Sequence, residues 1–336
     1  MLLDFRKLFV HRHSAFGEPR DWVSSSGLAV AVSIAYFLAA RVSLLLLTNP
    51  DGVAVFWPGA GVAAGTLIAL GPRARWPVAV GVMGATIVAH LLAGDRGILR
   101  FIVFALCNAG EAVLVAWLIE HYFGSSFRLD RLPNVLGLVA AAIVGTAVSG
   151  VGGTAGFVLF KSSTAPILTT WQHWFASDAL WIITVAPLLT GLGAAARDPP
   201  RRDEFIEGGV ALVALAVVSG LVIFLPREPW AVVVPVALLF PLLLWLAARC
   251  NPVFAAAAAF IVAFTIVLTI TFRVGIFDGT SFPIAERILT AQAGILTVSL
   301  CALVLAALFS ERRESEAHLV RSNMALQRER DNKLMN

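Results

Sequence analysis

The segment "VFWPGAGVAAGTLIALGPRARWP", residues 55–77, shows what kind of fold this chain adopts. It is apolar almost throughout, yet it contains four Gly, three Pro, two Trp and a pair of Arg near its end. Small residues four apart, here Gly61 and Gly65, let helix backbones approach closely in lipid. Proline is tolerated in the first turn of a helix, and Arg marks an end at the membrane surface. The segment therefore predicts a membrane-spanning helix with one tightly packed face.

The composition extends this prediction to the whole chain. Of 336 residues, 59% are hydrophobic and only 14% are charged, too few charges to cover a water-soluble fold of this length. Apolar stretches of about 20 residues recur, the length that crosses a bilayer. We expect an all-α, polytopic helical bundle with about ten transmembrane helices. The expected spans are 26–47, 54–71, 76–94, 98–120, 134–160, 168–192, 206–225, 230–248, 252–272 and 286–309.

The Lys and Arg residues predict the orientation of the bundle. If the N-terminus is cytoplasmic, basic residues favour the cytoplasmic segments by roughly three to one, as the positive-inside rule requires. An even number of spans then leaves both termini in the cytoplasm. The chain divides into a basic N-terminal segment (1–25), an integral membrane domain (26–310) and a charged C-terminal helical connector (311–336).

The connector continues the last span without Gly or Pro, which favours one helix running from the membrane into the cytoplasm. Leu319 and Leu326 are seven residues apart, as in a coiled-coil seam. A single heptad step also fits a solvated single helix, so both alternatives stand.

Further small residues mark a second seam within the expected fifth span. Gly145, Ser149 and Gly153 recur at intervals of four. Such spacing predicts helix packing, and the alternative is a glycine-rich segment that lines a ligand.

Ionisable side chains at membrane depth are the candidates for function, because a charge there costs several kcal/mol unless it is paired or hydrated. Glu111 lies near the middle of its span, and most of the others map to the outer half. We expect Arg41 to pair with Glu111 or Asp178, or else to extend its charge to the membrane surface. The acids are either a structural anchor between helices or a polar, proton-sensing site. The candidate signal-sensing residues are Arg41, Trp57, His90, Asn108, Glu111, His173 and Asp178.

Five ordered motifs resemble the first membrane-associated sensor (MASE) domain family of bacteria. They are "YFLAARVSLLL", "VFWPGAGVAAGTLIALGPRARWPVAVGVMGATIVAHLL", "CNAGEAVLVAWLI", "GGTAG" and "WFASDALWIITVAPLL". The resemblance covers most of residues 26–310. "CNAGE" departs from the family's usual order of Gly before Asn. The resemblance implies an input module of the bacterial inner membrane, joined to a histidine kinase, diguanylate cyclase or phosphodiesterase.

The sequence therefore predicts a sensory input domain, most simply that of a sensor histidine kinase of a two-component system. An ion-coupled secondary transporter is the alternative, and an intramembrane enzyme is a third class. The chain carries no catalytic motif and no metal-ligand spacing, and we expect no catalytic residue, cofactor or nucleic-acid partner. The expected partners are the lipid bilayer, a small-molecule or proton signal, a second copy paired through the C-terminal helix, and a fused or cognate output domain with its response regulator.

Overall fold

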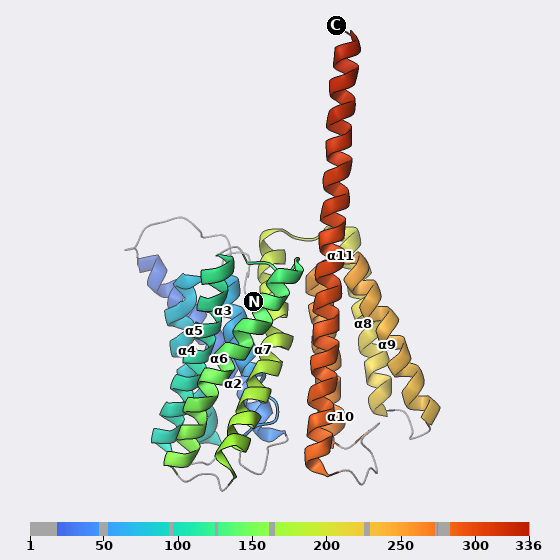
Figure 1. Cartoon of the computed structure of the whole chain (residues 1–336). Helices are drawn as coiled ribbons and strands as arrows, with labels where there is room; N and C mark the ends of the chain where they lie inside the picture. The colour runs from blue at the N-terminus through green and yellow to red at the C-terminus, as the bar shows by residue number, and fades with distance from the viewer. Residues whose placement is uncertain are drawn as a thin grey trace.

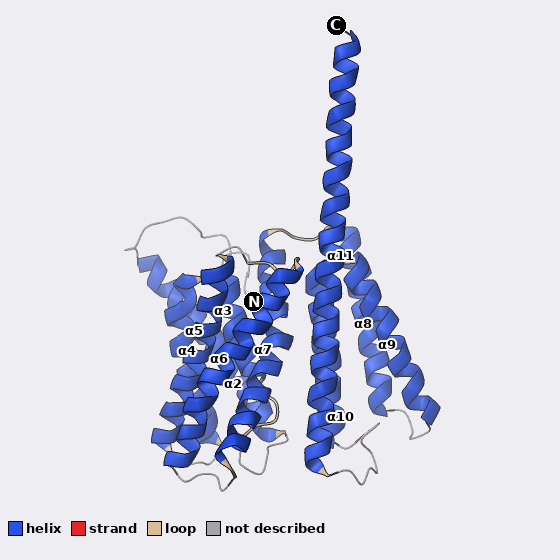
Figure 2. Cartoon of the chain, viewed as in Figure 1, coloured by secondary structure: helices blue, strands red, loops and turns tan. Residues whose placement is uncertain are grey.

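The computed structural model describes residues 19–46, 53–93, 97–124, 127–160, 165–224, 229–272, 274 and 283–335. Every regular element in these ranges is helical (Figure 2), so the predicted all-α fold is confirmed. The helices are α2 (Pro19–Leu45), α3 (Pro58–Leu70), the 3-10 turn η1 (Pro72–Ala74), α4 (Arg75–Leu92), α5 (Ile98–Phe123), α6 (Leu132–Leu159), α7 (Ile167–Arg197), α8 (Arg202–Phe224), α9 (Pro229–Arg249), α10 (Pro252–Phe272) and α11 (Ile284–Met335).

The helices have the length and surface that a bilayer requires. Within the described residues, eight are long and apolar enough to cross a membrane. Large apolar side chains face outward along them: Leu38 is 57% exposed, Val148 58% and Val210 66%. Apolar surface of this extent would aggregate in water but is ordinary against lipid. The chain is therefore a multi-pass helical membrane protein.

The helices run up and down in two groups, α2–α7 and α8–α11 (Figure 1). Helix α11 projects from one end of the bundle, which we call the tail end; the opposite end is the far end. Arg131 and Glu314, 3.2 Å apart, join the start of α6 to α11 at the tail end. At the same end α3 and α5 stop at Gly71 and Gly124, whose φ of 79° disfavours any other residue.

Helix α3 is too short to span a bilayer alone. Its 13 residues rise about 20 Å, against about 30 Å of hydrocarbon. The expected span 54–71 is wrong at its start, because the helix begins at Pro58 and the preceding Val53–Trp57 segment is not helical. All five residues of that segment are buried. Irregular backbone at this depth is tolerated only when protein shields it from lipid, and α2, α4, α5 and α7 surround α3.

One other boundary differs from expectation. Helix α2 begins at Pro19, so residues 19–25 are helical rather than part of a separate N-terminal segment; residues 1–18 lie outside the described ranges. Helix α11 contains 52 residues and runs without a break from the far end through the connector, as the absence of Gly and Pro there predicts. At 1.5 Å per residue it is about 78 Å long, and its last part stands clear of the bundle (Figure 1).

Close helix contacts occur at the predicted seams. A Cβ atom added at Gly61 would lie 2.2 Å from the carbonyl oxygen of Trp181, and one at Gly65 would lie 2.7 Å from Cα of Ala186. Helix α3 therefore packs backbone to backbone on α7. On α6, a Cβ at Gly145 would meet Val115 at 2.4 Å, and one at Gly153 would meet the Trp174 ring at 2.6 Å.

Candidate functional site

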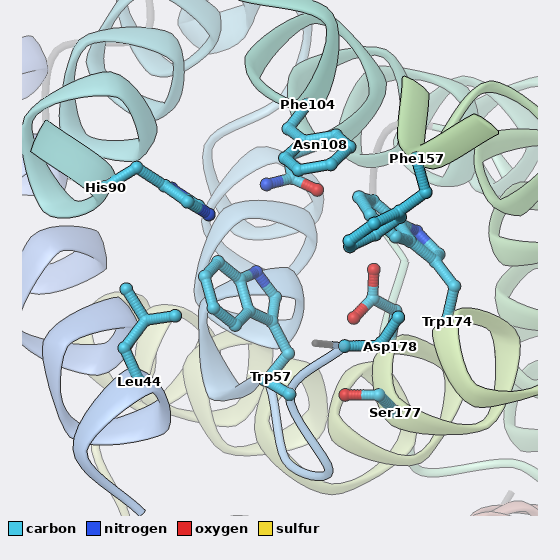
Figure 3. Close-up of a pocket in the computed structure, with 11 residues that line it drawn as sticks. Leu44, Trp57, His90, Phe104, Asn108, Phe157, Trp174, Ser177 and Asp178 are labelled. Carbon is cyan, nitrogen blue, oxygen red and sulfur yellow. The ribbon is translucent and has the colours of Figure 1, made fainter. Parts of the chain in front are cut away.

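A cavity of about 50 Å³ lies in the α2–α7 group toward the far end, where the Val53–Trp57 segment meets five helices. We call it the far-end cavity. Figure 3 shows the side chains of Trp57, His90, Asn108 and Asp178 directed into one space. Since one buried water needs roughly 10–15 Å³ of such volume, the cavity has room for about three to five waters. Its walls are Leu44, Val53, Ala54, Trp57, His90, Phe104, Asn108, Phe157, Trp174, Ser177 and Asp178.

Aromatic rings form one side of this cavity. The Phe104 ring centroid lies 4.8 Å from that of Phe157 and 5.4 Å from that of Trp174. The His90 ring lies 5.0 Å from Phe101. Its Nδ1 is 2.9 Å from the carbonyl oxygen of Thr86, which can only accept a hydrogen bond, so Nδ1 carries the proton. In the neutral ring Nε2 remains as an acceptor.

A line of hydrogen bonds crosses α2, α4 and α5 beside the cavity. The Trp57 indole Nε1 donates to the Tyr36 hydroxyl at 2.9 Å, and Tyr36 is completely buried. Tyr36 is also hydrogen-bonded to Thr86. The Asn108 amide reaches the Thr86 hydroxyl at 3.5 Å, the outer limit for such a bond. Trp57 is therefore fixed by polar contacts at the start of α3, although that helix lacks a side-chain cap.

Two buried carboxyl groups lie next to the cavity. Asp178 forms part of the wall and is hydrogen-bonded to Glu111, which lies behind it near the middle of α5. A carboxylate only accepts, so a bond between two carboxyl groups needs a proton on one of them. The Ser149 hydroxyl donates to Glu111 and accepts from the Trp174 indole Nε1 at 3.0 Å. Asp178 thus connects the cavity to a hydrogen-bonded group that joins α5, α6 and α7.

One polar atom in the wall has no such connection. The Ser177 hydroxyl is buried, and no other described residue hydrogen-bonds to it. One turn further along α7, the Trp181 indole nitrogen is likewise buried without a hydrogen-bond partner among the described residues. Buried polar groups are normally satisfied, so an unpartnered hydroxyl in a cavity wall indicates a place for water or a polar ligand.

Five of the seven predicted signal-sensing residues lie in the cavity wall or directly behind it. Trp57, His90, Asn108 and Asp178 form part of the cavity wall, and Glu111 supports Asp178 from behind. His173 is half-buried on α7 and is not part of this wall.

The expected pairing of Arg41 with a buried acid is wrong. Its Nη1 instead donates to the carbonyl oxygen of Ala89 at 3.4 Å, and no ion pair joins it to Glu111 or Asp178 within the described ranges. The physical reason is that Arg41 faces α4 while the two acids bind each other and Ser149.

Sequence reasoning missed several contributors. Tyr36 lies inside the motif "YFLAARVSLLL", and a tyrosine in an apolar span indicates a buried polar contact in a chain with only two tyrosines. The spacing of Ser149 predicts packing, yet its hydroxyl is also the hydrogen-bonding link between Glu111 and Trp174. No local pattern identifies Ser177 and Phe157 as wall residues, because the sequence does not show which face of a helix borders a cavity.

The chemistry available here is binding and proton storage. In the described part of the chain, no three His, Cys, Asp or Glu side chains gather closely enough to hold a metal ion. The cavity offers an unpartnered hydroxyl, an amide, an imidazole and a carboxyl group within aromatic walls. This set suits a small polar molecule, water or a proton.

Comparison with known proteins gives one match. The family model MASE1, a membrane-associated sensor domain, matches residues 28–313. No curated protein and no solved structure matches the chain. The match covers most of the chain, from the first turns of α2 to the point where α11 leaves the bundle. This chain therefore belongs to the MASE1 family, the membrane sensory domains of signalling proteins.

Proposed function

We propose that the chain is the sensory part of a bacterial histidine kinase of a two-component system, set in the inner membrane with both termini in the cytoplasm. A proton or small polar molecule reaches the far-end cavity from the periplasm or the lipid. Its binding changes the position of α11, whose tail pairs with that of a second copy. The tail passes the change to a kinase output domain, which acts on a response regulator.

The observation that carries this proposal is a contact between the cavity wall and α11. The Gln292 amide Nε2 donates to the carbonyl oxygen of Val55 at 3.3 Å. Val55 lies inside the Val53–Trp57 segment, which supplies three wall residues. A shift of that segment on binding therefore acts directly on the third turn of a helix that continues to Met335.

A second contact joins α11 to α7, the helix that supplies Trp174, Ser177 and Asp178 to the cavity wall. The Thr184 and Ser299 hydroxyls are 3.0 Å apart, and both are buried. Thr184 follows Ser177 and Asp178 on α7. Two separate cavity elements are thus hydrogen-bonded to the same helix, which is the arrangement a sensor needs to couple binding to output.

The size and polarity of the cavity support a small signal. A ligand shifts an equilibrium only as far as it prefers one of the two states. A polar ligand would give the Ser177 hydroxyl a partner, and a proton would change the protonation of the Glu111–Asp178 pair, whereas an apolar ligand would leave the Ser177 hydroxyl unsatisfied. Ionisable groups buried in a membrane domain commonly serve such roles.

The test is a chimera in which Asn336 is joined in register to the dimerisation and catalytic part of a histidine kinase with a known promoter. Promoter output is measured in cells over an external pH series and with candidate small polar compounds. We expect Gln292→Leu to uncouple output from the stimulus, because it removes the bond to Val55. The control is Thr297→Val, an exposed α11 residue whose hydroxyl bonds only within its own helix.

The acid pair gives the second arm of the same test. Glu111→Gln and Asp178→Asn should change output while the protein still inserts, as measured by membrane fractionation. His90→Gln and Tyr36→Phe separate the remaining titratable groups around the cavity. If both acid variants and Gln292→Leu respond like the unmodified chimera, the sensing mechanism is wrong. A topology reporter placed after Asn336 that reads as periplasmic would reject the orientation.

A further inference from the structure

A second and larger cavity lies at the tail end, between α7, α10 and α11. Its volume is about 250 Å³, about five times that of the far-end cavity. Four separate segments of the chain supply its charged lining: the residues before α6, the start of α8, the α9–α10 turn and α11. The charged residues are Arg128, Asp130, Arg201, Glu204, Arg249 and Arg313.

The charges of this lining do not balance. Within the lining itself, four guanidinium groups face two carboxylates. Arg128 is paired with Asp130 at 3.2 Å and, outside the lining, with Asp198 at 4.0 Å. Arg249 also pairs outside the lining, with Glu207 at 2.6 Å, so the positive charge that remains is that of Arg201 and Arg313.

Two of the arginines are not neutralised by an acid. Arg313 donates to the carbonyl oxygens of Ala248 and Cys250 at 2.9 and 3.1 Å, which orients its guanidinium without cancelling its charge. Arg201 is in none of the ion pairs found among the described residues, although Glu204, the remaining acid of the lining, follows it by three residues. The cavity therefore holds positive charge on both sides, from α11 and from the α7–α8 connection.

We propose that this tail-end cavity binds a phosphate-bearing anion. A guanidinium presents a planar set of N–H donors that matches phosphate oxygens, often two at a time. Arginines from several directions suit an anion with three or four oxygens better than a single carboxylate. The same chemistry comes from two sources at this level of the membrane: the headgroup of an anionic lipid or a free phosphate compound in the cytoplasm.

An anion in this position would hold α11 at its exit from the bundle. Arg313 and Ser310 belong to α11, whereas Arg128 precedes α6 and Arg201 precedes α8. One bound group contacting these arginines ties α11 to the α2–α7 group and to the start of α8, so it resists movement of the tail. This binding is independent of the proposed kinase output and of the far-end cavity, and it is measured on the chain itself.

The experiment uses the full chain, purified in a zwitterionic detergent and in nanodiscs. Binding of inorganic phosphate and pyrophosphate is measured by titration calorimetry, and retained lipid by native mass spectrometry after reconstitution with phosphatidylglycerol or phosphatidylcholine. The test variants are Arg201→Gln and Arg201→Gln/Arg313→Gln. The matched control is Arg202→Gln/Arg312→Gln, which removes the same charge at adjacent positions that do not line the cavity. Circular dichroism checks that each variant is folded.

We expect saturable binding that falls at least tenfold in Arg201→Gln and is unchanged in the control. Loss of phosphate or pyrophosphate binding identifies a free anion as the ligand; loss of retained phosphatidylglycerol, with no phosphate binding, identifies a headgroup. Arg201→Gln leaves the hydrogen bonds of Arg313 intact. The effect of this single variant on binding can therefore be measured even if the double variant does not fold. Absence of both kinds of binding, or equal loss in test and control variants, overturns the proposal.

Discussion

Replacing Gly61 by alanine tests the contact between α3 and α7. The added Cβ would lie 2.2 Å from the backbone oxygen of Trp181 and 2.6 Å from Cβ of Val185, and a backbone oxygen cannot turn aside as a side chain can. Overpacking of this kind costs about 1–3 kcal/mol, against a gain of about 0.5–1 kcal/mol from removing a helix glycine. We expect Gly61→Ala to lower the free energy of unfolding by about 1–2 kcal/mol.

The control is Gly110→Ala on α5. Gly110 is exposed, and nothing lies within 4 Å of a Cβ placed there, so only the helix gain applies. We expect this variant to be unchanged or up to about 1 kcal/mol more stable.

The measurement is reversible unfolding in mixed micelles of rising SDS fraction, followed by tryptophan fluorescence of the nine tryptophans. If Gly61→Ala matches Gly110→Ala, the backbone contact between α3 and α7 is not as described.

Three further predictions concern the acid pair, the tail-end ion pair and the tail. Ser149→Ala removes a partner from both Glu111 and Trp174 and should cost about 1–3 kcal/mol, whereas Ser219→Ala, at a buried hydroxyl without a partner among described residues, should cost nothing; the same SDS titration compares them. Arg75 and Glu120 form an ion pair with side chains 35% and 30% exposed. A double-mutant cycle with Arg75→Gln and Glu120→Gln should therefore give a coupling free energy below about 1 kcal/mol. A larger coupling would show that the pair is less hydrated than these exposures indicate. Single cysteines placed along residues 316–327, in a chain with Cys107, Cys250 and Cys301 replaced by serine, should cross-link between copies with heptad spacing that includes Leu319 and Leu326; a flat profile would argue for an unpaired helix.

Much of the fold could be predicted because hydrophobic length is a local property. The range 252–272 matches α10 at both ends, and most other predicted spans agree within a few residues. The exceptions have local causes. Helix α3 begins at Pro58 and not at the expected residue 54. Helix α2 begins with a polar turn at Pro19, and apolar length does not detect a polar turn.

The pairings within the site could not be predicted in the same way. In lipid, the faces of a helix that meet other helices and those that meet the bilayer are both apolar, so periodicity does not show which is inside. Arg41 illustrates this: its position in the sequence fits a partner such as Glu111, but the rotation of α2 turns it toward the backbone of α4. Ser149 shows the converse, since a small residue suited to packing proved to be a hydrogen-bond donor as well.

The shortness of α3 has a consequence for how the protein is made. As the nascent chain leaves the translocon, α3 and the Val53–Trp57 segment cannot rest in lipid alone, because their free amide and carbonyl groups would be unsatisfied. Their backbone contact, α7, begins more than 100 residues later at Ile167. The segment must therefore stay in a protected environment until α7 has been synthesised, so a chaperone or the insertion machinery has to retain the early helices, and truncation before α7 should send the protein to degradation.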